Sequence, residues 1–173
     1  MSKIFLAGLA LLFLGSACAG LQSSESGGSV SKGEPPVIIQ SFASKQLAAG
    51  DTWKIFLNAS DVNGDMKQIV STVSQPGVGE SVSYTRIKRE DEREFSGYIY
   101  LNTFDAPNYS ALNSTTLTLT VQIKDTAGNI SKPQVFPLSF NSTFTQEPPP
   151  PGVFKEKDVG AILITLRTPF GRR

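Results

Sequence analysis

Hydrophobic and polar residues alternate with a period of two over much of the chain, most clearly between residues 115 and 124. There Leu117, Leu119, Val121 and Ile123 alternate with threonine, glutamine and lysine side chains. This alternation predicts a β-strand that has one buried face and one face in water.

Six further stretches carry a similar signal and are separated by turn residues. They are residues 37–42, 53–59, 67–73, 81–87, 95–103 and 135–140. Beyond the amino-terminal leader, no stretch sustains the i, i+3, i+4, i+7 spacing of an amphipathic helix. About seven short strands predict an all-β fold in which two sheets form a sandwich, because a sheet with one apolar face must bury that face. Phe56 breaks the alternation of its stretch, and we expect it to pack at a sheet edge.

The amino terminus has the pattern of a cleavable export signal. Lys3 supplies a positive charge, residues 4–15 form an uncharged, largely apolar run, and small residues lead into Cys18. A run of about 12 residues is too short for the ~30 Å hydrocarbon core of a bilayer, which needs roughly 20. We therefore predict that residues 1–17 are a signal peptide.

The segment Leu14-Gly15-Ser16-Ala17-Cys18 resembles the lipobox of bacterial lipoproteins, although Gly15 stands where that family usually has leucine. The resemblance implies that Cys18, the single cysteine of the chain, is fatty-acylated and anchors the mature protein in the cell envelope. Ala19 is not acidic, which in lipoproteins of two-membrane cells implies sorting to the outer membrane. The alternative is an ordinary secretory signal in which Cys18 is incidental.

Two linkers divide the rest of the chain. Residues 18–34 are rich in serine and glycine, which predicts a flexible tether that starts at the lipidated cysteine. Residues 145–152 contain four consecutive prolines, which predict a semi-rigid polyproline II linker. The sandwich is therefore expected to span residues 35–144 and to be followed by a tail at residues 153–173.

The tail contains an apolar run at residues 159–166 that is too short to span a membrane. Two roles are open for it: an extra strand of its own sandwich, or a strand that pairs with the sheet edge of another protein. In the second role, the candidate partner-binding residues are Ile162, Leu163, Ile164 and Leu166.

Two turn motifs follow predicted strands. Residues 59–65 read Ala-Ser-Asp-Val-Asn-Gly-Asp, and residues 121–131 read Val-Gln-Ile-Lys-Asp-Thr-Ala-Gly-Asn-Ile-Ser. Both resemble strand-end motifs of bacterial immunoglobulin-like domains. The resemblance implies an immunoglobulin-like β-sandwich over residues 35–141 but no particular activity, because such domains serve as spacers, adhesin modules, sugar-binding appendages and docking modules.

The same turns carry the candidate metal ligands. The first interpretation is structural, because glycine supplies a positive φ and Asp and Asn side chains cap nearby backbone amides. The alternative is calcium, for which the candidate ligands are Asp61, Asn63, Asp65, Asp125 and Asn129. The first three have the one-three-five spacing of an EF-hand loop, and the other two add ligands if the loops converge. Met66 and Thr72 replace the glycine and glutamate of that loop.

The candidate chemistry of the chain is sparse. Histidine is absent, which removes the usual general base and the commonest zinc ligand. We predict no catalytic residue, no cofactor and no enzyme activity. The 16 basic and 15 acidic residues give a net charge of +1, which does not attract nucleic acid. Residues 88–94 are densely charged with interleaved signs, and we expect them to form a solvated hairpin tip.

These features predict a membrane-anchored lipoprotein of the cell envelope whose non-catalytic sandwich binds or scaffolds another envelope protein. The alternative is a carbohydrate-binding or adhesin module that uses the aromatic residues Tyr98, Tyr100, Phe104 and Tyr109. A hydrolase ranks third, because histidine is absent.

Overall fold

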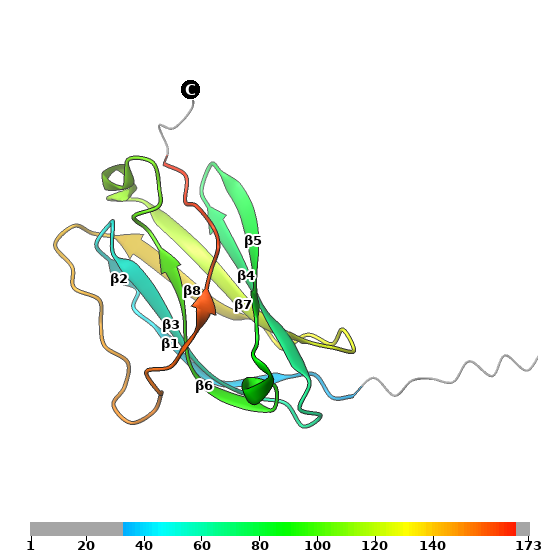
Figure 1. Cartoon of the computed structure of the whole chain (residues 1–173). Coiled ribbons are helices and arrows are strands. Elements are labelled where there is room, and N and C mark those ends of the chain that lie inside the picture. The colour runs from blue at the N-terminus through cyan, green and yellow to red at the C-terminus, as the bar shows by residue number, and fades with distance from the viewer. Residues whose placement is uncertain (1–32, 169–173) are drawn as a thin grey trace, which may run out of the picture. The chain divides into compact units, whose positions relative to one another are not determined.

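The computed structural model describes residues 33–168, which belong to one compact unit. The strands are β1 (Val37–Ala43), β2 (Gln46–Leu47), β3 (Thr52–Ser60), β4 (Met66–Gln75), β5 (Gly79–Arg86), β6 (Glu94–Asn102), β7 (Thr116–Asp125), β8 (Gln134–Phe140) and β9 (Asp158–Ala161) (Figure 1). Two short 3-10 helices are η1 (Arg89–Asp91) and η2 (Tyr109–Leu112). Within residues 33–168, no helix is long and apolar enough to cross a membrane. The predicted signal peptide and Cys18 lie outside the described residues.

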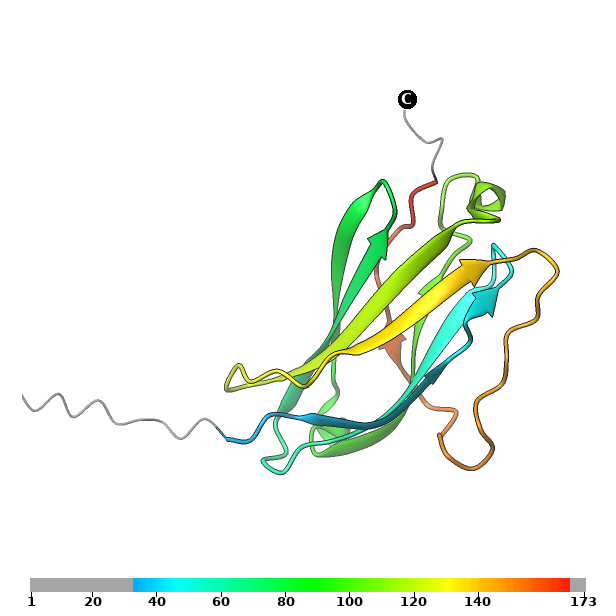
Figure 2. The same ribbon diagram turned by 180° about the vertical axis from the view of Figure 1, so that it is seen from behind.

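The strands form two sheets that pack face to face (Figures 1 and 2). The four-stranded sheet has the order β1-β3-β6-β9, and the five-stranded sheet has the order β2-β8-β7-β4-β5. Neighbouring strands are antiparallel except for the pairs β2 with β8 and β6 with β9, which are parallel. All seven predicted strands are present, so the predicted all-β sandwich is confirmed, and β2 and β9 are added to it.

The strand order is that of an immunoglobulin-like sandwich. Such sandwiches place strands A, B, E and D in one sheet and C, F and G in the other. β1, β3 and β6 take the places of A, B and E, and β4, β7 and β8 take the places of C, F and G. β9 lies beside β6 at the place of strand D, but it comes from the end of the chain and runs parallel to its neighbour.

The core lies between the sheets. It is built from the side chains of every second residue along the strands, which point inward. Every second residue of β7 from Leu117 to Ile123 is buried, as the period of two predicts. Trp53 is fully buried in β3, and its indole Nε1 donates a hydrogen bond to the carbonyl oxygen of Ser44 at 2.9 Å. The largest core side chain therefore has its polar group paired.

Phe56 does not lie at a sheet edge, because β3 pairs with β1 on one side and with β6 on the other. Its ring lies on the outer face of the four-stranded sheet. There it contacts Tyr98, at 5.5 Å between ring centroids, and Phe154, at 5.7 Å. An aromatic residue of the tail thus covers this outward side chain, which explains why the alternation is broken at a position inside the sheet.

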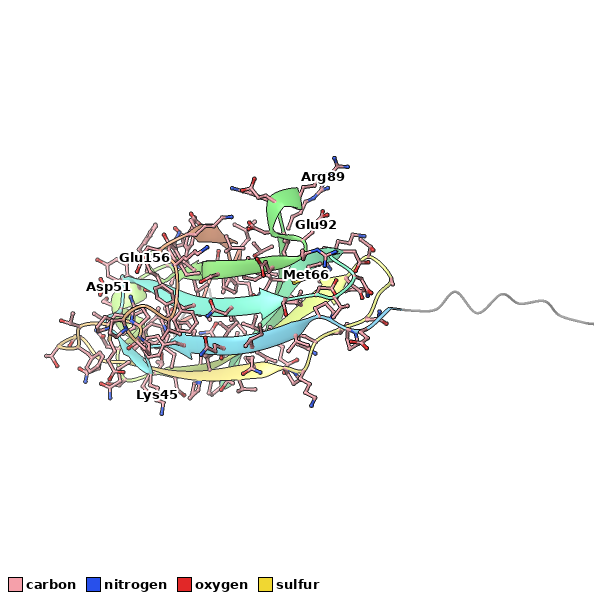
Figure 3. All side chains as sticks on the ribbon, turned by 90° about the horizontal axis from the view of Figure 1, so that it is seen from below. Lys45, Asp51, Met66, Arg89, Glu92 and Glu156 are labelled. Atoms are coloured by element: carbon pink, nitrogen blue, oxygen red, sulfur yellow. The ribbon has the colours of Figure 1, made fainter. Side chains whose placement is uncertain are left out.

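Residues 88–94 do not form a hairpin tip. β5 and β6 belong to different sheets, so this segment crosses from one sheet to the other and contains η1. Arg89 projects into solvent (Figure 3), but Asp91 is buried. The interleaved charges indicated solvation correctly for Arg89 and wrongly for Asp91, which faces a lysine from a distant part of the chain.

The sandwich does not end at residue 144. The predicted linker at residues 145–152 contacts it, because Gln146 Oε1 accepts a hydrogen bond from the backbone N–H of Lys54 at 3.0 Å. The chain then continues into β9, which pairs with β6. Of the two roles open for the tail, residues 158–161 take the first and form a strand of their own sandwich.

Candidate functional site

The first Asp/Asn turn connects β3 to β4 and is closed by Asp61. Its carboxylate accepts hydrogen bonds from the backbone N–H groups of Asn63 at 3.3 Å and Asp65 at 3.0 Å. Gly64 has a φ of 71°, which glycine adopts without strain. Burial raises the pKa of Asp61, whereas the hydroxyl of Thr126 donates to Asp65 and lowers the pKa of that carboxyl.

The second turn follows β7 and uses Asp125 in the same way. Its two carboxylate oxygens accept hydrogen bonds from the backbone N–H and the side-chain Nδ2 of Asn129, both at 2.7 Å. The two turns meet, because the backbone N–H of Thr126 donates to the carbonyl oxygen of Asp65 at 3.1 Å. The loops therefore converge, which is the condition that a shared calcium site requires.

The carboxylate oxygens of Asp61 and Asp125 already have protein partners, whereas Asp65 Oδ1 is buried without a hydrogen-bond partner. Asp61 and Asp125 are almost fully buried and accept hydrogen bonds from N–H donors. Across residues 33–168, no group of three or more His, Cys, Asp or Glu side chains is placed to hold a metal ion.

We expect that about 5 mM calcium, which is above the affinity range of weak extracellular sites, leaves the melting temperature (Tm) of the protein unchanged. A rise in Tm that EDTA reverses would contradict this expectation.

Both turns also hold the chain where it enters the sandwich. Asn63 Nδ2 donates a hydrogen bond to the carbonyl oxygen of Glu34 at 3.1 Å, and Asn129 Nδ2 donates to the carbonyl oxygen of Gly33 at 2.9 Å. We call this end of the sandwich, formed by residues 61–65 and 125–131, the tether pole. The turn motifs alone did not predict these contacts with the incoming chain.

Asp125→Ala is expected to destabilise the sandwich by about 2–3 kcal/mol, because it removes two hydrogen bonds to a buried carboxylate. Urea denaturation, followed by the fluorescence of the single tryptophan, measures the change. Asp105→Ala removes an exposed carboxylate and is the control, with an expected change within about 0.5 kcal/mol. Equal losses in the two variants would refute the capping role of Asp125.

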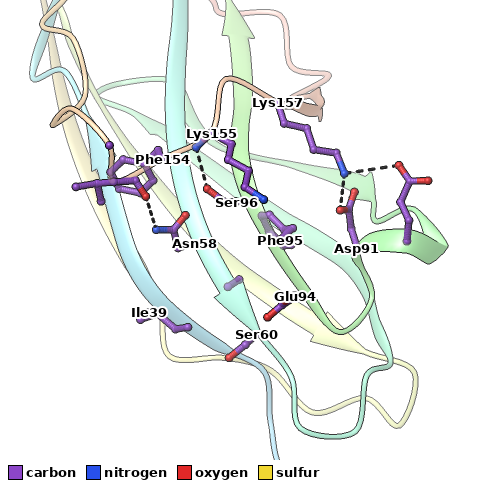
Figure 4. Close-up of a pocket in the computed structure, with 14 residues that line it drawn as sticks. Ile39, Asn58, Ser60, Asp91, Glu94, Phe95, Ser96, Phe154, Lys155 and Lys157 are labelled. Atoms are coloured by element: carbon purple, nitrogen blue, oxygen red, sulfur yellow. Dashed lines mark hydrogen bonds and ion pairs between the residues drawn. The ribbon is translucent and has the colours of Figure 1, made fainter.

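A groove of about 590 Å³ lies beside the tail, along the end of β3 and the start of β6 (Figure 4). Asn58 and Ser60 of β3 and Ser96 of β6 line it, and residues 152–155 and Lys157 of the tail line its opposite side. Three acidic side chains, Glu90, Asp91 and Glu94, also line it, together with the apolar residues Ile39, Ala59 and Phe95. Amide and hydroxyl groups in this arrangement offer hydrogen bonds to a peptide main chain.

Lys157 joins the tail to the segment that crosses between the sheets. Its Nζ lies 2.6 Å from Asp91 Oδ1 and 3.6 Å from Glu90 Oε1. The hydrogen bond to the Asp91 carboxylate raises the pKa of Lys157 above its ordinary value of 10.5. The pair therefore fixes the tail at the acidic end of the groove.

This pair predicts how stability depends on alkaline pH. Because the pKa of Lys157 is raised in the folded state, the pair stabilises fully below pH 10.5 and loses its effect as the pH rises through the folded value. Lys157→Arg keeps its charge at these pH values. Above pH 10.5 the native protein is expected to lose stability relative to that variant, as urea denaturation at matched pH measures. Parallel pH profiles for the two proteins would contradict the prediction.

The main chain of residues 153–167 is held by polar side chains of the sandwich. In the groove, Asn58 Nδ2 donates to the carbonyl oxygen of Val153 at 2.9 Å. Ser96 Oγ accepts from the backbone N–H of Lys155 at 2.9 Å (Figure 4). We call residues 153–167 the C-terminal segment.

Two residues of β5 continue this series. Thr85 Oγ1 donates to the carbonyl oxygen of Ala161 at 2.8 Å, and Ser83 Oγ accepts from the backbone N–H of Leu163 at 2.9 Å. Both side chains belong to the five-stranded sheet, whereas β9 pairs with the four-stranded sheet. The C-terminal segment therefore bridges the two sheets along one side of the sandwich.

Gln75 and β6 make the remaining main-chain contacts. Gln75 Oε1 accepts from the backbone N–H of Arg167, and its Nε2 donates to the carbonyl oxygen of the same residue, both at 3.0 Å. The backbone N–H of Tyr98 in β6 donates to the carbonyl oxygen of Lys157 at 2.8 Å. These contacts bind the segment through its peptide groups rather than through its side chains.

The structure separates the four candidate partner-binding residues of the tail. Ile162 and Leu166 are buried in the core of their own sandwich, so they serve the fold. Ile164 is partly buried and packs against the core. Leu163 is 79% exposed and is the member of this set that is open to another molecule.

The aromatic candidates for glycan binding do not form one surface. Tyr98 and Tyr100 lie on β6 with ring centroids 6.4 Å apart, and Tyr98 also packs against Phe56. Phe104 and Tyr109 belong to the connection between β6 and β7 and are 52% and 46% exposed. The first two residues therefore support sheet packing, and the second two are open to a ligand.

Gly97 is a site residue that reasoning from the sequence missed. A Cβ atom at this position would lie 2.5 Å from the carbonyl oxygen of Lys157 and 2.8 Å from Val159 Cγ2. Only glycine allows the C-terminal segment to approach β6 this closely. Gly97 interrupts the alternation of residues 95–103, and a glycine inside a strand is a recognised signal of close backbone approach.

No protein-family model and no curated protein sequence matches the chain. Among solved structures, the chain is similar to the PKD domain of an M14-like peptidase from a Thermoplasmatales archaeon, with 13% sequence identity and a TM-score of 0.37. The match covers 63% of this chain and 98% of that domain. The fold assignment comes from the strand order of the chain itself, which is that of an all-β, immunoglobulin-like sandwich.

Proposed function

We propose that this chain is a lipid-anchored protein of a bacterial cell envelope, in the outer membrane where the cell has two membranes, and that its sandwich is a non-catalytic module that binds another envelope protein. The proposal starts from the export signal and from Cys18, the single thiol, at the expected cleavage boundary. A cysteine that carries more than one acyl chain holds a protein stably at a membrane.

The observation that carries the proposal is the place where the chain enters the sandwich. Asn63 and Asn129 hold the carbonyl groups of Glu34 and Gly33 at the tether pole. The turn between β4 and β5 and the loop that contains η2 lie at the opposite end (Figures 1 and 2). We call this end the distal pole. A tether fixed at one end directs the distal pole away from the anchor.

The distal pole carries groups that suit a protein interface. Phe104 and Tyr109 expose about half of their surface there. Aromatic side chains are enriched among the residues that dominate binding energy at interfaces, because they bury a large area at a low cost in entropy. We therefore place the partner-binding surface at these two residues.

Fatty-acid labelling tests the anchor. Cells that express the full chain are grown with an alkyne-bearing fatty acid and then separated into membrane and soluble fractions. The native chain is expected to carry the label and to stay with the membrane, whereas Cys18→Ser is expected to lose both properties. Ser23→Ala, in the predicted tether, is the control and should behave as the native chain does. An unlabelled native chain, or a membrane-bound Cys18→Ser variant, would overturn the anchor.

Affinity purification from crosslinked cells tests the binding surface. The double variant Phe104→Ala, Tyr109→Ala is expected to lose co-purifying envelope proteins that the native chain retains. Tyr84→Ala with Val135→Ala removes similar apolar area from the exposed face of the five-stranded sheet and is the control. An identical set of partners for all three proteins would exclude the distal pole as the binding surface.

A further inference from the structure

We propose that the surface of β6 and β5 that holds the C-terminal segment is a binding site for the main chain of an extended peptide, and that the C-terminal segment of a second copy of this chain can occupy it in place of the chain's own segment. Two copies that exchange these segments would form a two-fold dimer in which each gives a strand and receives one. The inference does not depend on the lipid anchor or on the distal pole.

Besides the ion pairs of Lys157 with Asp91 and of Glu156 with Lys54, the polar contacts in this site are made to peptide groups. Asn58, Ser96, Thr85, Ser83 and Gln75 all pair with backbone N–H or carbonyl groups of the C-terminal segment. Main-chain hydrogen bonds of this kind give affinity to an added strand. They are the same whether the segment comes from the same chain or from another copy.

The apolar contacts select the sequence of the occupant. Val159 fills the space that Gly97 leaves open in β6, with its Cγ2 2.8 Å from the place of a Cβ atom. Ile162 and Leu166 complete the core, and Lys157 pairs with Asp91 outside it. The site therefore fits an extended segment with a lysine followed by apolar residues two, five and nine positions later, which is the pattern of residues 157–166.

The chain between β8 and the C-terminal segment allows an exchange. Residues 142–145 are largely exposed, and in the described part of the chain their hydrogen bonds all end at Asn141. We call residues 142–145 the hinge. Opening the hinge breaks few contacts of its own, and every contact beyond it is restored when the segment binds a second copy. The net cost of exchange is therefore mainly the loss of translational freedom on association, which a high protein concentration offsets.

Isotope-mixed photocrosslinking tests the exchange without destabilising the protein. The full chain is prepared in detergent with a photoreactive amino acid in place of Leu163, whose backbone N–H pairs with Ser83 but whose side chain is exposed. Heavy-isotope and light-isotope batches are mixed at high concentration, incubated and irradiated. Crosslinked peptides that join light residue 163 to heavy β5 are expected. Crosslinks within one isotope only would overturn the exchange.

Further measurements test whether the occupant is a second copy of this chain or a strand of a different protein. The same photoreactive residue at Val135, which lies on β8, is the control and should give no mixed-isotope crosslink to β5. A synthetic peptide of residues 153–167 is expected to reduce the mixed crosslinks, whereas the peptide with Ile162→Asp and Leu166→Asp is not. If a photoreactive residue at the exposed Tyr84 captured a strand of a different protein in cells, and no second copy, the proposed occupant would be wrong.

Discussion

Truncation after Lys157 is expected to leave the sandwich largely unfolded at room temperature. It removes Val159, Ile162 and Leu166, which are all part of the hydrophobic core between the sheets. Each loss of a large core side chain costs about 2–5 kcal/mol, whereas the whole stability of a domain is about 5–15 kcal/mol. Circular dichroism and the fluorescence of the buried Trp53 measure the unfolded fraction.

Single substitutions in the same segment test whether the loss of stability comes from the buried side chains and not from the shortening of the chain. Ile162→Ala is expected to cost about 2–5 kcal/mol in urea denaturation, because the side chain is buried. Leu163→Ala, one residue further, removes a side chain that is 79% exposed and should change stability by less than about 0.5 kcal/mol. Similar effects in the two variants would show that the tail does not belong to the core.

Trp53→Ala is expected to have the largest effect of any single substitution in β3, about 3–5 kcal/mol. The indole is completely buried, and its Nε1 donates to the carbonyl oxygen of Ser44. The variant therefore leaves both a cavity and an unpaired carbonyl group. Because the chain has one tryptophan, circular dichroism rather than fluorescence follows its unfolding.

Trp53→Phe divides this effect into its two parts. Phenylalanine keeps much of the apolar volume but cannot donate to Ser44, so a loss of about 1–3 kcal/mol is expected. A loss as large as that of the alanine variant would mean that the hydrogen bond to Ser44, and not the filled volume, dominates the role of Trp53.

The seven strands were predictable because they depend on local sequence. The alternation in β7 reflects the fixed period of side chains in a strand. The apolar or polar character of each residue therefore indicates whether it lies on the buried or the exposed face. The two Asp/Asn turns were also readable, because Asp61 and Asp125 cap backbone amides within four residues of themselves. In both cases the interacting groups are close along the chain.

The features that were missed depend on contacts between distant residues. Phe56 was expected at a sheet edge because nothing near it in sequence indicates Phe154 as its cover. The buried state of Asp91 depends on Lys157, 66 residues away. Four prolines indicated a linker, but they could not indicate that the chain returns to the sandwich after them.

The candidate site was predicted in part. The Asp/Asn loops converge as the calcium hypothesis required, yet their asparagines hold Gly33 and Glu34. The groove for the C-terminal segment was not predicted, because serine, threonine and glutamine on strands are common and give no signal of binding. Gly97 was the one local clue to it.

The late position of β9 in the chain has a consequence for biosynthesis. A chain made from its amino end cannot close this core until Leu166 has left the ribosome. Until then β6 has an open edge, which is the kind of surface on which nascent strands aggregate. A sandwich that closes only when β9 arrives stays open while the strands before it are made, and we expect it to need a chaperone most during this interval.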